Sequence, residues 1–373
     1  MRIAVNTRFL LPGRLEGLGW YTHEMLWRLV QRHPEHEYLF LFDRPFDPAF
    51  VYSERVTPKV VFPPARHPLL FYLWFEHAVP RVLRQWKPDV FFSPDNFLSL
   101  SAPVPTLLTI HDVIPLQMPE QIKWVHRQYY NLYLRRFIAR ADHILTISDY
   151  VKRSITEECG TSADKITVAW NGCRTQFVPI ATAEQQEVRQ AFSDGKPYFF
   201  YTGAIHPRKN IPRLIRAYTR FRARTGAEVL LLLGGRFMGH DTAVTEALDA
   251  SPYKNDVRIL GYVKDHDLAR LMGSAMALVY PSLSEGFGLP VLEAMSADVP
   301  VLTSNTTALP EVAGDAAILV NPLDEAAIAH GLEQLLDAAF RQALVEKGRI
   351  QRNLFSWDTA AEQLHDCLVG LGR

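Results

Sequence analysis

The sequence predicts an α/β protein of two domains, each built on a parallel β-sheet with helices on both faces. In both halves of the 373 residues, short apolar runs alternate with amphipathic helical segments. The alternation breaks once, between Asn171 and Lys196, where Pro179 and a turn at 193–195 interrupt the apolar pattern. Because short apolar runs between helices indicate βαβ units, we expect two Rossmann-like domains that face each other across a cleft. In such sheets, ligands bind beyond the carboxyl ends of the strands.

The expected elements follow from the position of each apolar run. The strands of the first half lie at 2–6, 38–43, 90–92, 106–110, 143–146 and 165–168, with a further short strand at 60–62. Those of the second half lie at 198–202, 229–233, 257–260, 277–280, 299–303 and 317–320. Amphipathic helices are clearest at 19–32 and 122–140. We place the first domain at 1–175 and the second at 190–356.

Composition excludes several classes of protein. Forty basic residues balance forty acidic ones, so nothing in the net charge indicates a nucleic acid partner. Three cysteines without paired spacing are typical of a reducing cytoplasm. The N-terminus has no apolar run of signal-peptide length, and no apolar stretch is long enough to span a bilayer. We therefore expect a cytoplasmic protein, at most peripheral on the inner face of a membrane.

Two glutamates flank a glycine turn in the segment YPSLSEGFGLPVLEAM, residues 280–295. Their spacing of eight residues is by itself weak evidence for a binding site, because it occurs twice more, at Glu16 with Glu24 and at Glu325 with Glu333. The context is specific: Glu285 follows a strand, Gly286 and Gly288 allow close approach of a ligand to the backbone, and Glu293 lies one turn into a helix. The helix N-terminus attracts phosphate, and carboxylates accept hydrogen bonds from vicinal hydroxyls. The alternative is a surface loop followed by a helix-favouring glutamate.

A basic loop, TGAIHPRKN at 202–210, follows the first strand of the second half. Arg208 and Lys209 stand at the end of a strand, where fixed cations can stabilise the negative charge of a ligand, and His206 is a further neighbour. A solvated basic turn is the alternative.

In the first half, two loops carry candidate site residues. Gly17 and Gly19 precede the first expected helix, but Thr22 stands where a dinucleotide-binding fingerprint requires a small residue. A shortened glycine loop that approaches a diphosphate fits better than that fingerprint, and a simple turn is the alternative. His111 and Asp112 follow the strand at 106–110, at a position where active sites form in such folds. The alternative for Asp112 is a cap on the following turn.

These motifs resemble family 4 retaining glycosyltransferases of the GT-B fold. The 285–293 segment matches the pattern E-G-F-G-x-x-x-x-E, and 203–210 matches G-x-x-x-P-R-K-N. The resemblance implies that Glu293 binds the nucleotide ribose, that Glu285 binds a hydroxyl of the transferred sugar, and that Lys209 binds the diphosphate. Many relatives carry Arg where this chain has Ala204, which leaves the direction of Arg208 open.

Further sites are implied by the same resemblance. The loop from Ser284, with the amides of Gly286, Phe287 and Gly288, would line the pocket for the sugar donor together with Gly203. Tyr262 and Val263 would lie near the nucleobase. His111 or Asp112 would contact the donor sugar or lie near the acceptor hydroxyl. The last segment, 357–373, resembles a final helix that packs back onto the first domain.

The resemblance implies transfer of a hexose from a nucleotide sugar to an acceptor hydroxyl with retention. No side-chain nucleophile is needed, because the leaving phosphate oxygen can deprotonate the incoming hydroxyl. An inverting reaction would instead make Asp112 or His111 a general base. The motifs LEGLGWYTHE and TIHDVIP resemble bacterial mannosyl- and rhamnosyltransferases. GDP-mannose is the first donor we expect, and the acceptor would be a glycan or a lipid-linked glycan in polysaccharide or glycolipid assembly.

Three alternatives stay open. A sugar-nucleotide epimerase of the same fold would act without an acceptor, and a non-catalytic protein would bind the nucleotide sugar without turnover. The Asp265-x-Asp267 pair resembles a metal–diphosphate motif, but Asp265 as a helix N-cap explains it, so we expect no metal and no other cofactor. The basic aromatic helix at 123–140 is expected to have one core face and one solvated face, with weak contact to an anionic membrane as the alternative.

Overall fold

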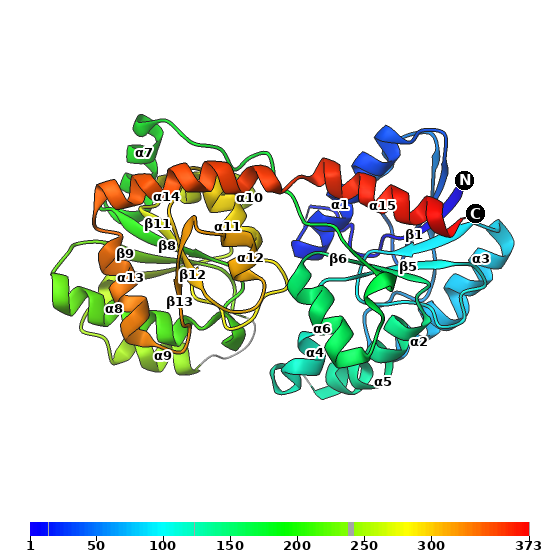
Figure 1. Ribbon diagram of the computed structural model, residues 1–373, viewed down its shortest axis with the longest axis horizontal. Coiled ribbons are helices and arrows are strands. Elements are labelled where there is room, and N and C mark those ends of the chain that lie inside the picture. Colours follow the sequence, from blue (N-terminus) through cyan, green and yellow to red (C-terminus); the bar gives the residue numbers. More distant parts are fainter. Residues whose placement is uncertain (14, 123, 238–241, 373) are drawn as a thin grey trace. The chain divides into compact units, whose positions relative to one another are not determined.

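The computed structural model describes residues 1–13, 15–122, 124–237 and 242–372. The chain forms two compact units: Met1–Gly172 together with the segment from Ser356 onward, and Cys173–Phe355. Each unit contains one parallel sheet (Figure 1). This confirms the predicted fold class of two parallel-sheet α/β domains.

The first unit has a sheet of seven strands in the order β3-β2-β1-β4-β5-β6-β7, and all neighbours are parallel. The strands are β1 (Arg2–Asn6), β2 (Glu37–Phe42), β3 (Val56–Val60), β4 (Val90–Ser93), β5 (Thr106–Ile110), β6 (His143–Thr146) and β7 (Ile166–Val168). The helices are α1 (Gly17–Arg32), α2 (Pro68–Leu73), α3 (Val79–Trp86), α4 (Ile114–Gln117), α5 (Trp124–Arg140), α6 (Asp149–Cys159) and α15 (Trp357–Leu371). Single turns occur at Pro48–Phe50, Pro119–Gln121 and Ala163–Lys165, with a π-turn at Trp74–Ala78.

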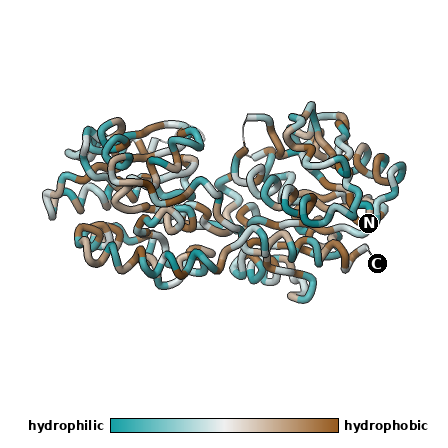
Figure 2. The backbone as a smooth tube through the Cα atoms, turned by 90° about the horizontal axis from the view of Figure 1, so that it is seen from above, coloured by the Kyte–Doolittle hydropathy of each residue, from teal (hydrophilic) through white to brown (hydrophobic). Residues whose placement is uncertain are grey.

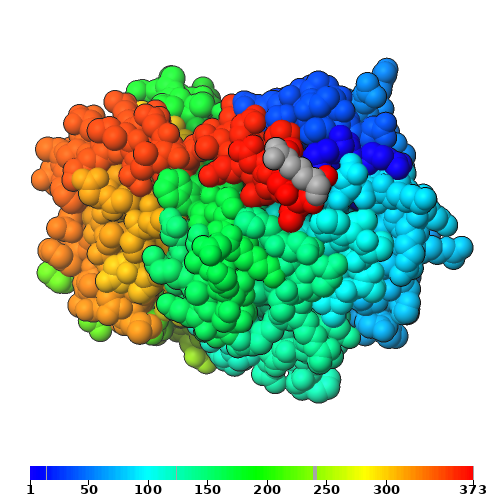
Figure 3. Space-filling view, turned by 45° about the vertical axis from the view of Figure 1, so that its right-hand side comes forward, coloured from blue at the N-terminus to red at the C-terminus, as the bar shows by residue number. Residues whose placement is uncertain are grey.

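Helices cover both faces of this sheet. On one face, the side chains of α2, α3, α5 and α6 pack against alternate strand residues such as Leu41, Phe91 and Leu108, all of them buried. On the other face, α15 packs against α1 and against β4, β5 and β6 (Figure 1). In the space-filling view, α15 (red) lies on the surface beside the N-terminal residues in blue (Figure 3). Arg373, the last residue of the expected helical range, lies outside the described residues.

The second unit has six parallel strands in the order β10-β9-β8-β11-β12-β13. They are β8 (Tyr198–Thr202), β9 (Leu230–Gly234), β10 (Val257–Gly261), β11 (Ala277–Tyr280), β12 (Val301–Ser304) and β13 (Ala317–Val320). The helices are α7 (Thr182–Ser193), α8 (Ile211–Thr225), α9 (Thr242–Asp249), α10 (Asp265–Ser274), α11 (Leu289–Ser296), α12 (Leu309–Ala313), α13 (Glu325–Gln334) and α14 (Ala338–Gln351). Single turns occur at Pro207–Lys209, Lys254–Asp256 and Arg352–Leu354. Hydrophobic and hydrophilic positions alternate along the helices (Figure 2), as expected for helices with one buried side.

Two expectations about elements are wrong. The edge strand β3 lies at Val56–Val60 rather than at 60–62, because only Val56 of this strand is fully buried and its apolar pattern is therefore weak. The expected break at 171–196 contains helix α7, in which only Val188 and Ser193 are buried. Both elements lack the long apolar pattern on which a prediction from sequence depends.

Helix α5 has a core face and a solvated face, as expected. Tyr129, Leu134 and Phe137 are buried, whereas Trp124 and Leu132 are exposed. Lys123, the first residue of the expected basic aromatic helix, lies outside the described residues. Across the described ranges, none of the helices combines the length and the apolar character that crossing a membrane requires.

Candidate active site

The sheet of the second unit positions the candidate site. If its strands are numbered along the chain with β8 as the first, their order across the sheet is 3-2-1-4-5-6. The connection from β8 to β9 and the connection from β11 to β12 therefore run in opposite directions. Ligands bind at such a switch point, beyond the carboxyl ends of the strands. The loop after β8 carries Arg208 and Lys209, and the loop after β11 carries Glu285. The two loops are joined by a hydrogen bond from the Leu283 amide to the Arg208 carbonyl, 2.8 Å long.

Glu285 is the centre of this cluster. Its Oε1 accepts hydrogen bonds from Lys209 Nζ at 2.5 Å and from Ser282 Oγ at 2.5 Å. The Tyr280 hydroxyl donates to the same oxygen at 2.9 Å and accepts from Lys209 Nζ at 2.5 Å. Arg208 Nη1 lies 2.8 Å from the other oxygen, Oε2. The direction of Arg208, which the sequence left open, is therefore toward Glu285.

The Glu285 carboxyl is ionised at neutral pH. Burial raises the pKa of the Glu285 carboxyl, but Lys209 and Arg208 outweigh it and lower that pKa to about 2. Burial, followed by the charge of Glu285, raises the pKa of Tyr280 well above its usual value, so its hydroxyl stays protonated. One carboxylate beside two cations leaves a net positive charge at the switch point, as an anionic ligand requires.

Glycines permit the close packing of these loops. Gly203 has a φ of +135°, a conformation that favours glycine. Gly235, after β9, lies beside it in space, and a Cβ at Gly235 would lie only 1.8 Å from the Gly203 carbonyl oxygen. Gly288 has a φ of +113° and is the N-cap of α11, where a Cβ would lie 2.7 Å from a Leu309 methyl carbon. The first amides of a helix have no acceptor within the helix. In this first turn Pro290 has no N–H and the Val291 amide donates to the Gly288 carbonyl at 2.9 Å, so the helix dipole, rather than a set of open amides, would attract a phosphate to the start of α11.

Glu293 lies on the buried side of α11 and is paired with a residue that the sequence did not indicate. Arg174 donates to Glu293 Oε1 from Nε at 2.9 Å and from Nη2 at 2.8 Å. Arg174 Nη1 also contacts Asp265 Oδ1 at 3.1 Å. Burial raises the pKa of Glu293, and the Arg174 charge only partly opposes this. Arg174 thus fixes the orientation of the Glu293 carboxylate.

The remaining expected residues of the second unit surround this cluster. The Ser284 carbonyl accepts a hydrogen bond from Arg208, and His206 accepts one from the Arg208 amide at 3.3 Å. Phe287 is buried and packs edge-on against Phe355, 5.6 Å between ring centres. Its amide, rather than its ring, is thus the group suited to a ligand. Gly286, between Glu285 and Phe287, belongs to the same turn.

The Gly261–Val263 segment follows β10 and exposes an aromatic ring. Tyr262 is 45% exposed, and the Arg236 guanidinium lies 4.4 Å from its ring centre. Val263 lies close to Gly234 at the end of β9. The resemblance implied that this segment lies near the nucleobase and contacts it mainly through the backbone, which stays a prediction.

The expectation for Asp265 is wrong in one respect. The N-cap of α10 is Lys264, and Asp265 is the first helical residue, without a side-chain capping hydrogen bond. Asp265 instead pairs with Arg174. An acidic group in the first turn of a helix is favoured by the helix dipole, and the absence of a metal at this pair stays a prediction.

In the first unit, His111 is buried at the end of β5. Its Nε2 donates to the Pro94 carbonyl at 2.7 Å, and its amide donates to Asn96 Oδ1 at 2.8 Å. Burial lowers the pKa of His111 to about 4, so the ring is neutral at pH 7 with its lone pair on Nδ1. Asp112 Oδ1 accepts from the Ile114 amide at 3.2 Å, which is the turn-capping contact considered as the alternative for this residue.

The two N-terminal glycines lie within α1, not in a loop before it, and this corrects the expected boundary. The helix begins at Gly17, with Glu16 as N-cap. A Cβ at Gly17 would meet no atom within 4 Å, whereas a Cβ at Gly19 would lie 2.8 Å from the Phe9 carbonyl oxygen. Gly19 therefore allows the first turn of α1 to pack against the chain that follows β1, and only Gly17 presents an open backbone surface.

Comparisons with known proteins agree with this geometry. Residues 182–351 match the model of the glycosyl transferases group 1, and residues 15–177 match that of glycosyltransferase family 4. The O-antigen chain mannosyltransferase B of Escherichia coli is 35% identical over 283 residues, which cover 75% of this chain and 74% of that protein. The chain belongs to the family 4 glycosyltransferases.

One further relative of this glycosyltransferase and one solved structure of similar fold extend the comparison. The O-antigen chain mannosyltransferase RfbU of Salmonella typhimurium is 30% identical over 238 residues, which cover 63% of this chain and 62% of that protein. The crystal structure of Anabaena HepE in complex with UDP-glucose superposes with a TM-score of 0.76 and 19% identity, over 100% of both chains. The second likeness shows the shared GT-B fold.

Several residues that contact or resemble the expected site residues were missed from sequence. Arg174, Tyr280 and Ser282 complete the contacts of the two glutamates, and no motif marks them as partners. At the switch point of the first unit, Arg8 Nε lies 2.6 Å from Asp95 Oδ2, and Asn6 Nδ2 donates to the same oxygen at 2.9 Å. Polar residues directly after buried strands were the available signal for Arg8 and Asp95.

Proposed function

We propose that this glycosyltransferase moves a mannosyl group from GDP-mannose to a hydroxyl of a glycan or lipid-linked glycan, with retention of anomeric configuration. The observation that carries the proposal is the buried cluster of Lys209, Arg208 and Glu285 at the β8/β11 switch point. Its net positive charge and its place beside the N-terminus of α11 suit a nucleoside diphosphate.

The cluster supplies the chemistry that glycosyl transfer needs. As the bond between the sugar and the diphosphate breaks, negative charge grows on the diphosphate oxygens, and Lys209 and Arg208 stabilise it. Removal of one such group typically costs about 3 kcal/mol of barrier. Glu285 holds both cations in place and remains ionised, because its pKa is about 2. In the retaining reaction that we propose, the leaving phosphate oxygen deprotonates the incoming hydroxyl.

The choice of mannose rests on the relatives. Both curated relatives described above are named as mannosyltransferases of the O-antigen chain. The protein in the Anabaena structure holds UDP-glucose, but its 19% identity supports only the fold. GDP-mannose is therefore the donor that we propose, and an O-antigen-like polysaccharide is the acceptor class.

A donor screen with two readouts tests this function. The protein is incubated with GDP-mannose, GDP-fucose, UDP-glucose or dTDP-rhamnose, and both the melting temperature and nucleotide release are measured with and without a mannose disaccharide acceptor. We expect GDP-mannose to give the largest rise in melting temperature and an acceptor-dependent release of GDP. An α-linked trisaccharide identified by NMR supports retention, since the donor is α-linked, whereas a β-linkage contradicts it. Conversion of the sugar nucleotide without acceptor would support an epimerase instead.

We also propose that the transfer step uses no metal, since Lys209 and Arg208 supply the positive charge that a metal would otherwise provide. Transfer is expected to continue in excess EDTA. Loss of transfer in EDTA that Mg²⁺ or Mn²⁺ restores would contradict this part of the proposal.

A further inference from the structure

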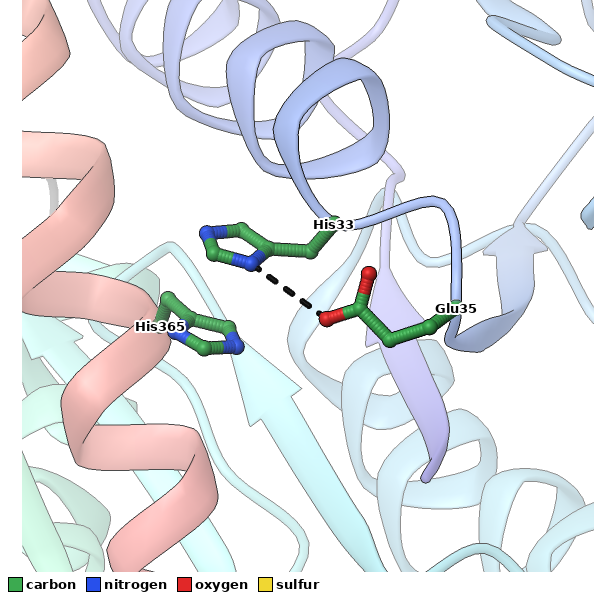
Figure 4. A group of neighbouring side chains, drawn as sticks. All are labelled: His33, Glu35 and His365. Carbon is green, nitrogen blue, oxygen red and sulfur yellow. Dashed lines mark ion pairs between the residues drawn. The ribbon is translucent and has the colours of Figure 1, made fainter.

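Three histidines and a glutamate meet where the C-terminal helix packs on the first unit. His33 follows the last residue of α1, Glu35 and His36 lie in the turn before β2, and His365 lies on α15. Figure 4 shows His33, Glu35 and His365 gathered between α1 and α15. Segments some 330 residues apart in the sequence, at His33 and Glu362, are thus brought into contact. None of these residues belongs to the proposed active site.

The side-chain atoms of this histidine cluster lie at short distances. One atom from each of His33, Glu35 and His365 lies within 4.8 Å of the others. His33 Nδ1 lies 3.5 Å from Glu35 Oε1, and His36 Nε2 lies 3.6 Å from that oxygen. His36 Nε2 is also 3.1 Å from His365 Nε2. A tetrahedral Zn²⁺ with Zn–N bonds near 2.05 Å holds its ligand atoms about 3.4 Å apart, close to these separations.

The surrounding contacts prepare the rings for a cation. His33 Nε2 lies 3.2 Å from Glu362 Oε2, on the side of the ring opposite to the Nδ1 that faces Glu35. A carboxylate that holds the outer N–H of an imidazole is the usual second contact of a metal-bound histidine.

We propose that the cluster binds one divalent transition-metal ion of the Zn²⁺ class through His33, Glu35 and His365, with water at the fourth position. Imidazole nitrogens and a carboxylate oxygen are a donor set that favours Zn²⁺ over Mg²⁺ or Ca²⁺. Glu35 is more than half exposed, so an ion can enter from solvent.

Binding requires a small rearrangement and has a structural consequence. The His33 and His365 rings are stacked, with 3.4 Å between centres and 5° between planes. Because lone pairs lie in the ring planes, the rings must tilt toward each other to share one ion. The ion then joins the end of α1 to α15 and fastens the C-terminal helix to the first unit. This role is separate from sugar transfer.

Metal titration of the full-length protein tests the proposal. Protein treated with EDTA and desalted is titrated with Zn²⁺ against a chromophoric chelator, and with Co²⁺ to record the absorption of a tetrahedral site. We expect one equivalent to bind, a tetrahedral Co²⁺ spectrum, and a rise in melting temperature of at least about 2 °C at saturating Zn²⁺. Transfer activity in EDTA is expected to persist, which distinguishes this site from the proposed active site.

Variants identify the ligands. His365→Ala and Glu35→Ala are expected to weaken Zn²⁺ binding at least about tenfold. Glu35 is largely exposed, so its replacement leaves folding intact even if the His365 variant folds poorly. His330→Ala is the matched control. His330 is 65% exposed and lies 3.7 Å from Glu333; both residues belong to α13 of the second unit, outside the histidine cluster. Equal Zn²⁺ affinity in the wild-type, Glu35→Ala and His330→Ala proteins, or an octahedral Co²⁺ spectrum, would overturn the proposal.

Discussion

Arg174 and Glu293 form a buried ion pair in which two guanidinium nitrogens, Nε and Nη2, donate to the same carboxylate oxygen. Arg174 lies at the start of the second unit and Glu293 on α11, 119 residues later. The pair therefore fixes the chain entering the second unit against the helix that carries the proposed ribose ligand. Because both partners are buried, neither tolerates the loss of the other.

Replacement of Arg174 tests this relationship. Arg174→Ala leaves the Glu293 carboxylate buried without a cation, and we expect a loss of about 3–5 kcal/mol in the free energy of unfolding. Urea unfolding at pH 7 measures it. Arg224→Ala is the control, because Arg224 is 59% exposed in its pair with Glu333 and such pairs contribute at most about 1 kcal/mol. A loss in Arg174→Ala no larger than in the control would contradict the role assigned to the pair.

Lys209 is expected to act on the reaction rather than on folding alone. Lys209→Met keeps the aliphatic stem and removes the charge beside Glu285, and we expect kcat/KM to fall by about 10²–10³. Steady-state release of GDP from GDP-mannose measures it. Lys196→Met is the matched control, since Lys196 forms a surface pair with Glu228 at 3.0 Å. A less than tenfold loss in Lys209→Met would rule out Lys209 as a ligand of the diphosphate.

His111 makes the stability of the first unit depend on pH. Its pKa is about 4 in the folded protein and near 6.5 when exposed, so the unfolded chain binds the proton more strongly. The stability that neutral His111 contributes is complete above pH 6.5 and is lost progressively as the pH falls toward 4, by about 3 kcal/mol in total.

Comparison of variants isolates this effect. When the pH falls from 7 to 4, the unfolding free energy of the wild type is expected to fall by about 3 kcal/mol more than that of His111→Gln. Urea titrations at several pH values measure it. His266→Gln, at a side chain that is 80% exposed, should show no such trend. A pH-independent difference for His111→Gln would show that His111 is not neutral and buried as described.

The two N-terminal glycines are expected to respond differently to alanine. Gly19→Ala brings a Cβ to 2.8 Å from the Phe9 carbonyl oxygen, and we expect a loss of about 1–3 kcal/mol in stability. Gly17→Ala meets no atom within 4 Å and should leave stability unchanged or raise it by at most about 1 kcal/mol. The family resemblance places Gly17 near a diphosphate, so we expect the same variant to lower kcat/KM at least tenfold. Full transfer activity in Gly17→Ala would show that this glycine only begins the helix.

Particular residues show why some features were predictable from sequence and others were not. Interior strands such as β5 and β8 are continuous apolar runs, because both of their faces are covered. The exposed edge strand β3 and the mostly solvated helix α7 have no such pattern, so β3 was misplaced and α7 was missed. The start of α1 was misplaced because glycines typical of a loop also occupy its first turn, where Gly19 packs against backbone.

The sequence by itself determined the two-sheet α/β architecture and the motifs that place this chain among the family 4 glycosyltransferases. Apolar periodicity and short glycine-containing motifs are local properties, readable within ten to twenty residues. Only the tertiary structure decided that Arg208 and Lys209 both contact Glu285, that Arg174 holds Glu293, and that His365 meets His33. These contacts join residues 76 to more than 300 positions apart, and strand order and helix packing, which no local pattern encodes, bring them together.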